Sequence, residues 1–309
     1  MSFRNSILQY YKNPRLLWCS LGNHHLLNWM PDKLYLQLIY KARTGRKLNL
    51  KNPQGYGEKL QWIKLYDRKP EYIQMVDKYT VREYIKTQIG EQYLIPLLGV
   101  WEDPREIDFS LLPEQFVLKC THDSGSVCIC KDKTNFDTAA AIKKLSRYQK
   151  IGTYWKTREW PYKHVKARII AEQYMEDESG EELMDYKVLC FNGIPKLIEL
   201  HRGRFNVHTQ DFYDTDWNKT DISQDRVGLP LTTEVMPKPA CFEEMMEKSA
   251  LLSKGIPHLR VDWYSINGRL YFGELTFFDA SGFDLFDRES DELMLGGWIQ
   301  LPTTKTIND

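Results

Sequence analysis

The sequence predicts an α+β fold in which a largely helical N-terminal region is followed by antiparallel strands. Apolar residues recur at spacings of three and four up to about residue 95, which is the period of amphipathic helices. Turn and strand signals alternate over residues 96–135 and return from residue 165 onward. Near the C-terminus, two apolar runs flank Asn267 and Gly268, the strongest short-range signal for a β-hairpin. We therefore expect three parts: a helical region at 1–95, a small strand-rich lobe at 96–175 and a C-terminal lobe at 176–309.

Amphipathic helices account for most of the first part. The expected helical stretches are 6–30, 32–43, 57–68 and 70–90. The first of them interleaves aromatic residues with Lys and Arg, so it could instead lie on a membrane surface, although a buried amphipathic helix is the commoner outcome. Peripheral membrane association therefore stays open.

The later elements follow from shorter patterns. Residues 116–133 predict two strands joined by a turn, and a helix is expected at about 136–150. The stretches 168–175 and 185–203, together with the final hairpin, predict strands of one antiparallel sheet. We expect loops at 210–220 and 230–240, and a helix at 241–255.

Composition limits the class of protein. Lys plus Arg and Asp plus Glu number 42 each in 309 residues, and this net charge of zero argues against a nucleic-acid-binding protein. No run of eighteen apolar residues and no secretory signal pattern occurs, so we expect a cytoplasmic protein, with the inner face of the membrane as an alternative. The six cysteines fit reduced thiols, since Cys120, Cys128 and Cys130 match no paired zinc-ligand spacing.

The C-terminal hairpin carries the chemistry that the residues indicate most directly. A two-residue loop at Asn267 and Gly268 would send the carboxylates of Asp262 and Glu274 to opposite faces. A three-residue loop that includes Ile266 would instead place Glu274 opposite Arg260, with Asp262 on the same face, and we adopt that register. Two carboxylates from neighbouring strands suit Mg²⁺, whereas the plainer alternative is a solvated cross-strand ion pair.

Two further segments carry weaker signals. Lys119 lies in an otherwise apolar strand and needs a polar destination for its ammonium group, which a phosphate could supply. The turn that follows, residues 121–126, has small residues whose N–H groups and hydroxyls could close over phosphate oxygens, but such turns are also common structural objects. The stretch from Glu172 to Lys187 could seat a purine and its ribose, or be an exposed acidic hairpin tip.

Together, these segments resemble the ATP-grasp fold, and more closely the TupA-like ATP-grasp family, over about residues 56 to 302. The segments that carry the resemblance are GEKLQWIKLYDRKP, VDKYTVREYI, YLIPLLGVWEDPREIDF, FVLKCTHDSGS, REWPYK, AEQYMEDESG, DYKVLCFNG, DFYDTDWN and RVDWYSINGRLYFGELTFFDASGF. The resemblance implies antiparallel sheets that clasp a nucleotide, with ATP and Mg²⁺ as cofactors. It also implies a role in bacterial surface polysaccharide, capsule or teichuronopeptide synthesis.

The resemblance assigns roles residue by residue. Lys78 and Lys119 would contact ATP phosphates, and Arg260 would lie beside the transferring phosphoryl group. Asp262, Glu274 and Thr276 would bind magnesium. The remaining nucleotide contacts that it implies are Ser124, Gly125 and Ser126 in the phosphate flap, Glu172, Gln173, Tyr174 and Met175 around adenine, Asp185 at the ribose and Lys187 at the phosphates.

Two positions depart from the family pattern. Thr276 stands where Asn is the usual last metal ligand, and it offers a more weakly coordinating hydroxyl. Asp123 stands where we expect Gly, which puts a negative charge near the incoming phosphates unless the side chain faces away or caps the turn.

The implied reaction is carboxylate–amine ligation through an acyl phosphate, in which positioning and electrostatic stabilisation do most of the work. A uronic-acid-containing or other sugar precursor would supply the carboxylate, and an amino acid or other amine would attack it. Candidate substrate contacts are His201, Arg202 and Arg204, where an arginine fork could hold a carboxylate; a basic loop balanced by nearby acids is the alternative.

Two other functions remain open at this point. The first is a sugar kinase or glycosyltransferase-associated enzyme on the same scaffold, with Asp279 or Asp284 as general base. The second is a non-catalytic nucleotide-binding protein, which the departures at Thr276 and Asp123 would suit.

Overall fold

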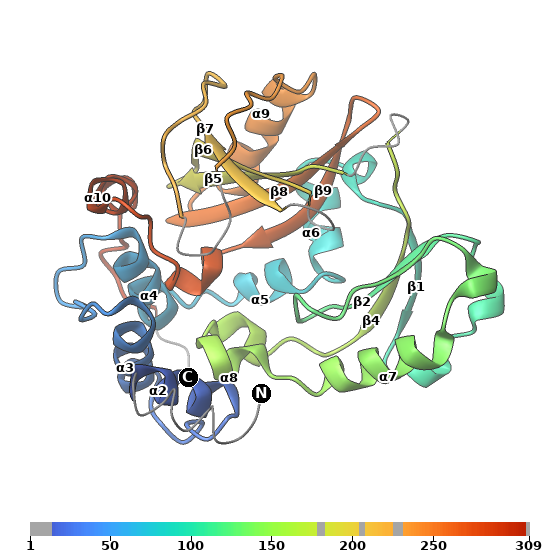
Figure 1. The fold of residues 1–309 in the computed structure, drawn as a ribbon, viewed down its shortest axis with the longest axis horizontal. Helices are drawn as coiled ribbons and strands as arrows, with labels where there is room; N and C mark the ends of the chain where they lie inside the picture. The colour runs from blue at the N-terminus through green and yellow to red at the C-terminus, as the bar shows by residue number, and fades with distance from the viewer. Residues whose placement is uncertain (1–13, 178–182, 204–207, 225–230, 307–309) are drawn as a thin grey trace.

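The computed structural model describes residues 14–177, 183–203, 208–224 and 231–306. Helices occupy most of the N-terminal region, and further helices lie between and after the strands (Figure 1). They are α2 (Pro14–Asn23), α3 (Asp32–Thr44), α4 (Tyr56–Tyr66), α5 (Glu71–Val76), α6 (Val81–Gln88), α7 (Thr138–Gln149), α8 (Thr153–Thr157), α9 (Phe242–Leu252) and α10 (Glu289–Trp298). None of the described helices is long and apolar enough to cross a bilayer.

The first sheet is antiparallel, with four strands in the order β1-β4-β2-β3. Its strands are β1 (Leu97–Trp101), β2 (Phe116–Cys120), β3 (Cys128–Cys130) and β4 (Ile169–Gln173). One face carries the buried Phe116, Leu118 and Cys120, which form a core with Leu145 of α7. Lys119 lies on the other face, because side chains alternate along a strand.

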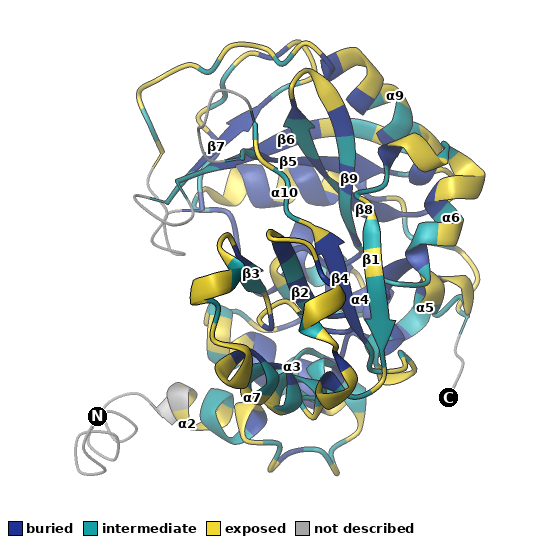
Figure 2. Cartoon of the chain, turned by 90° about the vertical axis from the view of Figure 1, so that its right-hand side faces the viewer, coloured by how far each residue is buried: buried dark blue, intermediate teal, exposed yellow. Residues whose placement is uncertain are grey.

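The second sheet is also antiparallel, with five strands in the order β7-β6-β5-β8-β9. Its strands are β5 (Asp185–Phe191), β6 (Ile194–Arg202), β7 (Thr209–Tyr213), β8 (His258–Ile266) and β9 (Arg269–Thr276). The central strand β5 is buried over its whole length (Figure 2). Helix α9 covers one face, where Trp263 donates its indole N–H to Ser249 Oγ over 2.8 Å. The two antiparallel sheets agree with the predicted fold class.

The N-terminal helices pack against the end of the chain. The amide of Gly57 at the start of α4 donates to Glu292 Oε1 of α10 over 2.7 Å, and Lys59 Nζ donates to the carbonyl of Ile299 over 2.7 Å. Figure 1 shows α3, α4 and α10 on the same side of the molecule, below and beside the second sheet. The N-terminal helices are therefore part of the structure that surrounds the C-terminal strands.

Several predicted elements need correction. The stretch 168–175 supplies β4 to the first sheet, so it is not part of one sheet with the later strands. The stretch 210–220 contains most of β7, where we predicted a loop. The expected helix at 6–30 is α2 followed by turns within the described residues, and its first part lies outside them. Residues 70–90 form two helices, α5 and α6.

The register of the β8–β9 hairpin differs from the adopted one. Ile266 pairs with Arg269, so the loop holds only Asn267 and Gly268, both at positive φ. A β-bulge at Gly273 then shifts the pairing by one residue. Asp262 consequently lies opposite Glu274, and Arg260 lies opposite Thr276. The prediction that the two carboxylates share a face is correct, but the bulge produces it and a three-residue loop does not.

Candidate functional site

Charged residues form a row across four strands of the second sheet. Lys187 of β5 lies opposite Glu199 of β6 on one side and Asp262 of β8 on the other. Asp262 in turn lies opposite Glu274 of β9. Directly opposite residues of antiparallel strands project to the same face, so these four side chains share one face of the sheet. Each cation or acid in the row therefore influences the ionisation of its neighbours.

The Arg260 guanidinium is the centre of this site. Its Nε donates to Asp262 Oδ1 and its Nη2 to Asp262 Oδ2, both over 2.7 Å, in a bidentate pair. Its Nη1 donates to Asp279 Oδ1 over 2.5 Å. The same Nη2 lies 3.2 Å from Glu274 Oε1 and 3.3 Å from Thr276 Oγ1. Three carboxylates thus converge on one arginine that is only 8% exposed.

The two carboxylates of the hairpin differ in acidity. Burial raises the pKa of Asp262 to about 6, although Arg260 opposes this and Glu274 adds to it as a like charge. Burial also acts to raise the pKa of Glu274, but Lys78 and Arg260 outweigh it and lower that pKa to about 2. Both groups are ionised at neutral pH. A pair of adjacent carboxylates with separated pKa values is typical of a functional site.

The hairpin presents oxygen atoms of the kind that magnesium prefers. Asp262 Oδ2 and Glu274 Oε1 both lie within 3.2 Å of the same guanidinium nitrogen, so hard oxygen donors from neighbouring strands already converge on one positive charge. Thr276 Oγ1, 3.2 Å from Glu274 Oε1, adds a neutral oxygen. No group of three or more His, Cys, Asp and Glu residues in the described ranges could hold a metal. Phosphate and water oxygens would have to complete the shell, as is usual for Mg²⁺.

Lys119, whose side chain is only 17% exposed, projects from the face of the first sheet opposite to Phe116 and Leu118 and is paired with Glu172. Its Nζ lies 2.6 Å from Glu172 Oε2, and Arg82 Nη1 of α6 lies 3.2 Å from Glu172 Oε1. We predicted that Lys119 contacts phosphate and Glu172 contacts adenine, and we did not expect the two side chains to contact each other. With two cations on one buried carboxylate, this cluster keeps a net positive charge that suits an anionic ligand.

Lys78 joins the two sheets. It lies between α5 and α6, donates to the carbonyl of Asp123 over 2.7 Å, and lies 3.5 Å from Glu274 Oε2. Asp123 belongs to the turn after β2, whereas Glu274 belongs to β9. Lys78 is therefore placed between the predicted phosphate flap and the predicted metal site.

The turn that follows β2 has an inward-facing and an outward-facing part. Ser126 is buried, and its hydroxyl donates to Asp123 Oδ1 over 2.6 Å while accepting the Cys120 amide over 2.7 Å. Asp123 therefore caps the turn, which is one of the two outcomes considered above. Ser124 and Gly125 are exposed and remain the accessible part of the predicted flap.

A strained segment that no sequence pattern predicted lies next to Arg260. Residues 280–282 all have positive φ, at 44°, 56° and 62°, directly after Asp279. Helix α4 holds this segment: Gln61 Nε2 donates to the carbonyl of Gly282 over 2.8 Å, and Lys64 Nζ donates to the carbonyl of Ser281 over 2.7 Å. Strain of this kind persists only where the surroundings enforce it, and it is common at functional sites.

A buried acid also contacts this segment. Ser281 Oγ donates to Glu159 Oε1 over 2.6 Å. Lys64 is fully buried, and this burial lowers its pKa to about 7, although Glu159 opposes the shift. The only sequence signals for this arrangement are the glycine at 282 and the polar residues within an apolar helix.

The predicted substrate contacts are divided between the two faces of β6. Arg202 is engaged by Glu234 at 2.8 Å and Asp211 at 3.5 Å, so it offers no free fork for a carboxylate. His201 is buried, and it pairs with Glu199 at 2.5 Å on the face that carries Lys187. Arg204 lies outside the described residues. Of the two that the structure describes, only His201 shares a face with the charged row.

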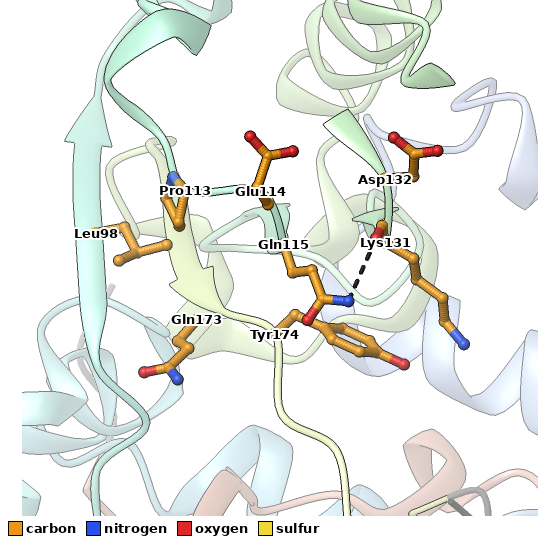
Figure 3. A pocket seen from close by; sticks show the side chains of 8 residues that line it. All are labelled: Leu98, Pro113, Glu114, Gln115, Lys131, Asp132, Gln173 and Tyr174. Atoms are coloured by element: carbon orange, nitrogen blue, oxygen red, sulfur yellow. Dashed lines mark hydrogen bonds between the residues drawn. The ribbon is translucent and has the colours of Figure 1, made fainter. Parts of the chain in front are cut away.

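A cavity of about 540 Å³ opens at the end of the first sheet (Figure 3). Its lining residues are Leu98, Pro113, Glu114, Gln115, Lys131, Asp132, Gln173 and Tyr174. The Lys131 ammonium lies 5.4 Å from the centre of the Tyr174 ring, at cation–π distance. Gln173 and Tyr174 belong to the stretch predicted to hold adenine, so this stretch borders an open space.

Comparison with known proteins gives a family match over most of the chain. Residues 58–300 match the model of the family described as TupA-like ATPgrasp. A search among curated proteins finds no similar sequence.

Solved structures give distant matches. One is a D-alanine–D-alanine ligase from Bacillus anthracis crystallised with ATP, with 15% identity and a TM-score of 0.40 over 71% of this chain and 57% of that one. The ligase from Helicobacter pylori has 13% identity and a TM-score of 0.43 over 79% and 69%. The D-cycloserine synthetase DcsG has 14% identity and a TM-score of 0.41 over 74% and 70%. The chain thus spans little more than half the length of the Bacillus anthracis enzyme.

Proposed function

The chain belongs to the TupA-like ATP-grasp family, and from that premise we propose that it is an ATP-dependent ligase that joins a carboxylate to an amine. The observation that carries this proposal is the convergence of Arg260, Asp262 and Glu274 on one face of the second sheet. Phosphoryl transfer needs positioning and charge stabilisation more than covalent chemistry, and this cluster provides both.

In the proposed reaction, a carboxylate oxygen of the substrate attacks the γ-phosphorus of ATP and ADP leaves. The amine then attacks the acyl carbon, phosphate leaves and an amide forms. Asp262, Glu274 and Thr276 would hold magnesium, which neutralises phosphate charge when bound. Arg260, held by Asp279, would face the transferring phosphoryl group.

Other residues would position the nucleotide. Lys78, Lys119 and Lys187 would contact phosphates, Ser124 and Gly125 would close over them, and Asp185 would reach the ribose. Lys119 is paired with Glu172, so an ATP phosphate would compete with the Glu172 carboxylate for the Lys119 ammonium group. The stretch Gln173–Met175 would border adenine, next to the cavity at Tyr174.

The acceptor that we propose is a uronic acid or other carboxylated sugar precursor of a bacterial surface polysaccharide. This assignment rests on the pathway with which the family is associated. For the sugar-kinase alternative, Asp279 is bound to Arg260 and is poorly placed to act as a general base, which leaves Asp284 as the candidate for that role.

A direct test combines calorimetry with an ADP-release assay. The intact protein should bind ATP only with Mg²⁺, and it should release ADP when a uronic acid and an amine are both present. Asp262→Asn should abolish turnover while the circular dichroism spectrum is unchanged. A stable phosphorylated sugar as product would favour a kinase, whereas nucleotide binding without turnover on any acceptor would favour a binding protein.

A further inference from the structure

The N-terminal end of the chain carries a net positive charge, whereas the whole chain is neutral. Residues 1–57 contain nine basic residues and one acid, although the complete sequence is neutral. The nine are Arg4, Lys12, Arg15, Lys33, Lys41, Arg43, Arg46, Lys47 and Lys51, and the acid is Asp32. The remaining chain therefore carries an equal excess of acid. A strong asymmetry of this kind is typical of a chain that meets an anionic surface with one end.

The single acid of this region is neutralised inside the protein. Asp32 Oδ2 accepts from Arg68 Nη2 over 2.6 Å, and Asp32 Oδ1 accepts from the Tyr154 hydroxyl over 2.7 Å. Arg158, which is buried, lies 3.5 Å from the same carboxylate. Asp32 is therefore engaged by groups from other parts of the chain and does not offset the exposed Lys33 and Lys41.

Exposed apolar side chains gather in the same region. Trp29 is 77% exposed, Leu26 is 61% exposed and Leu34 is 57% exposed. They lie within nine residues, in the turn between α2 and α3 and the first turn of α3. Trp18 and Leu17 of α2 are also partly exposed. Large apolar side chains exposed together usually mark an interaction site.

The basic and apolar residues share one side of α3. Lys33 and Leu34 are exposed at its start, and Lys41 lies two turns after Leu34, which returns it to the same face. The opposite face, with Leu36, Ile39 and Tyr40, is buried in the core. We call the exposed set of Leu26, Trp29, Lys33, Leu34 and Lys41 the N-terminal corner. Figure 1 shows α2 and α3 at the edge of the molecule, away from the second sheet.

We propose that the N-terminal corner docks on an anionic lipid surface. Trp and Leu enter the boundary between headgroups and acyl chains, and Lys side chains attract acidic headgroups. The corner consists of side chains on a folded surface, so the proposed association is peripheral. This inference does not depend on the proposed reaction.

Vesicle co-sedimentation with the full chain tests the proposal. Vesicles of phosphatidylcholine with about one third phosphatidylglycerol should bind the protein, whereas vesicles of phosphatidylcholine alone should bind it weakly. Binding should fall as salt rises, since exposed charges are screened within about 10 Å at 0.1 M salt. Equal binding to both vesicle types, or none to either, would overturn the proposal.

Variants of the N-terminal corner separate the contribution of its charge from that of its apolar side chains. Lys33→Gln with Lys41→Gln should lower the partition coefficient about 25-fold, because each cation near an anionic surface contributes about fivefold. Trp29→Ala should lower it several-fold at constant charge. The matched controls are Lys196→Gln with Lys254→Gln for charge, and Leu111→Ala, which is 82% exposed elsewhere, for apolar surface.

The control variants distinguish binding through the N-terminal corner from binding through net charge alone. The control variants should bind anionic vesicles like the wild type, with unchanged melting curves for all variants. Equal loss in the control and corner variants would show that net charge alone drives binding and would overturn the assignment to this corner. Retention of a duplex oligonucleotide, with no vesicle binding, would identify a nucleic acid as the anionic partner and would likewise overturn it.

Discussion

Asp262 gives the first prediction, which concerns pH and stability. Burial, with Glu274 as a like charge, raises its pKa to about 6 from an ordinary value of 3.8. Between these values the folded protein binds more protons than the unfolded chain, so the free energy of unfolding should fall as pH rises from about 4 to about 6. In Asp262→Asn this decline should be absent. Chemical denaturation at several pH values measures it, and parallel pH profiles for the two proteins would contradict the assignment.

The same residue links pH to metal binding. A carboxylate must be ionised to bind magnesium, so Mg-ATP affinity should fall below about pH 6 as Asp262 takes up a proton. Calorimetric titrations at pH 7.5 and 5 should show this loss. Glu274, whose pKa is about 2, should remain ionised over the whole range. Unchanged affinity at pH 5 would contradict a metal-binding role for Asp262.

At the residue scale, sequence alone identified Arg260, Asp262 and Glu274 as a group, because strand alternation and a hairpin signal place charged residues on one face. It did not indicate that Asp279 completes the ring around Arg260. Asp279 lies beyond the end of β9, in a segment whose conformation depends on α4. Contacts between residues more than two hundred positions apart leave no local pattern in the sequence.

Among the elements, the β8–β9 hairpin depends on two glycines for different reasons. A Cβ on Gly273 would lie 3.0 Å from the carbonyl oxygen of Asp262, so a side chain there would crowd this carbonyl and the bulge favours glycine. Gly268 has open space around it but a φ of +73°, which favours glycine for conformational reasons alone. The hairpin signal at residues 267–268 was visible in the sequence, whereas the bulge was not, and this is why the adopted register was wrong.

The two glycines therefore make a matched pair of variants. Gly273→Val should displace Asp262 from Glu274 and weaken Mg-ATP binding by at least tenfold, because the carboxylates no longer converge. Gly268→Ala should cost about 1 kcal/mol of stability through backbone strain and leave binding unchanged. Thermal melting and calorimetry of both variants separate these effects. Equal binding by Gly273→Val and wild type would show that the bulge does not set the site.

Helix α4 provides a second test at this scale. Lys64→Met should remove the donor to the carbonyls of Thr157 and Ser281, which costs about 2 to 4 kcal/mol and releases the segment that holds Asp279. Lys59→Met on the same helix loses one contact to the carbonyl of Ile299, which is not part of that segment, and is the control. Only Lys64→Met should weaken Mg-ATP binding at a temperature where both variants are folded. Similar affinities for the two would argue that α4 is structural only.

For the molecule as a whole, periodicity in the sequence predicted the helical N-terminal region and antiparallel strands, but it did not assign strands to sheets. β4 was grouped with the second sheet because its pattern is the same in either one. β7 was missed since its five residues include polar Thr209, Gln210 and Asp211. In the fold Gln210 donates to Glu199 of β6, and Asp211 accepts from the amide of Thr232. Sheet membership depends on pairing between remote parts of the chain, and this pairing is not encoded in local alternation.

The two sheets meet through Lys78, and this gives the last prediction. Its ammonium group binds the carbonyl of Asp123 in the flap turn and lies 3.5 Å from Glu274 in the second sheet. A nucleotide between the sheets would use this cation, so Lys78→Gln should weaken Mg-ATP binding by about 10- to 100-fold, the value of a charge-assisted hydrogen bond. In the wild type, Mg-ATP should protect amides of both residues 121–126 and β9 from hydrogen exchange.

The control for this experiment is Lys86→Gln, whose ammonium group is exposed and pairs only with Glu91 across 3.1 Å among the described residues. It should keep the affinity and the exchange protection of the wild type. In Lys78→Gln, saturating Mg-ATP should still protect β9, since Asp262 and Glu274 are intact, but should no longer protect the flap turn. If the flap is protected as fully as in the wild type, Lys78 does not couple the two sheets, and the nucleotide must reach the flap through Lys119.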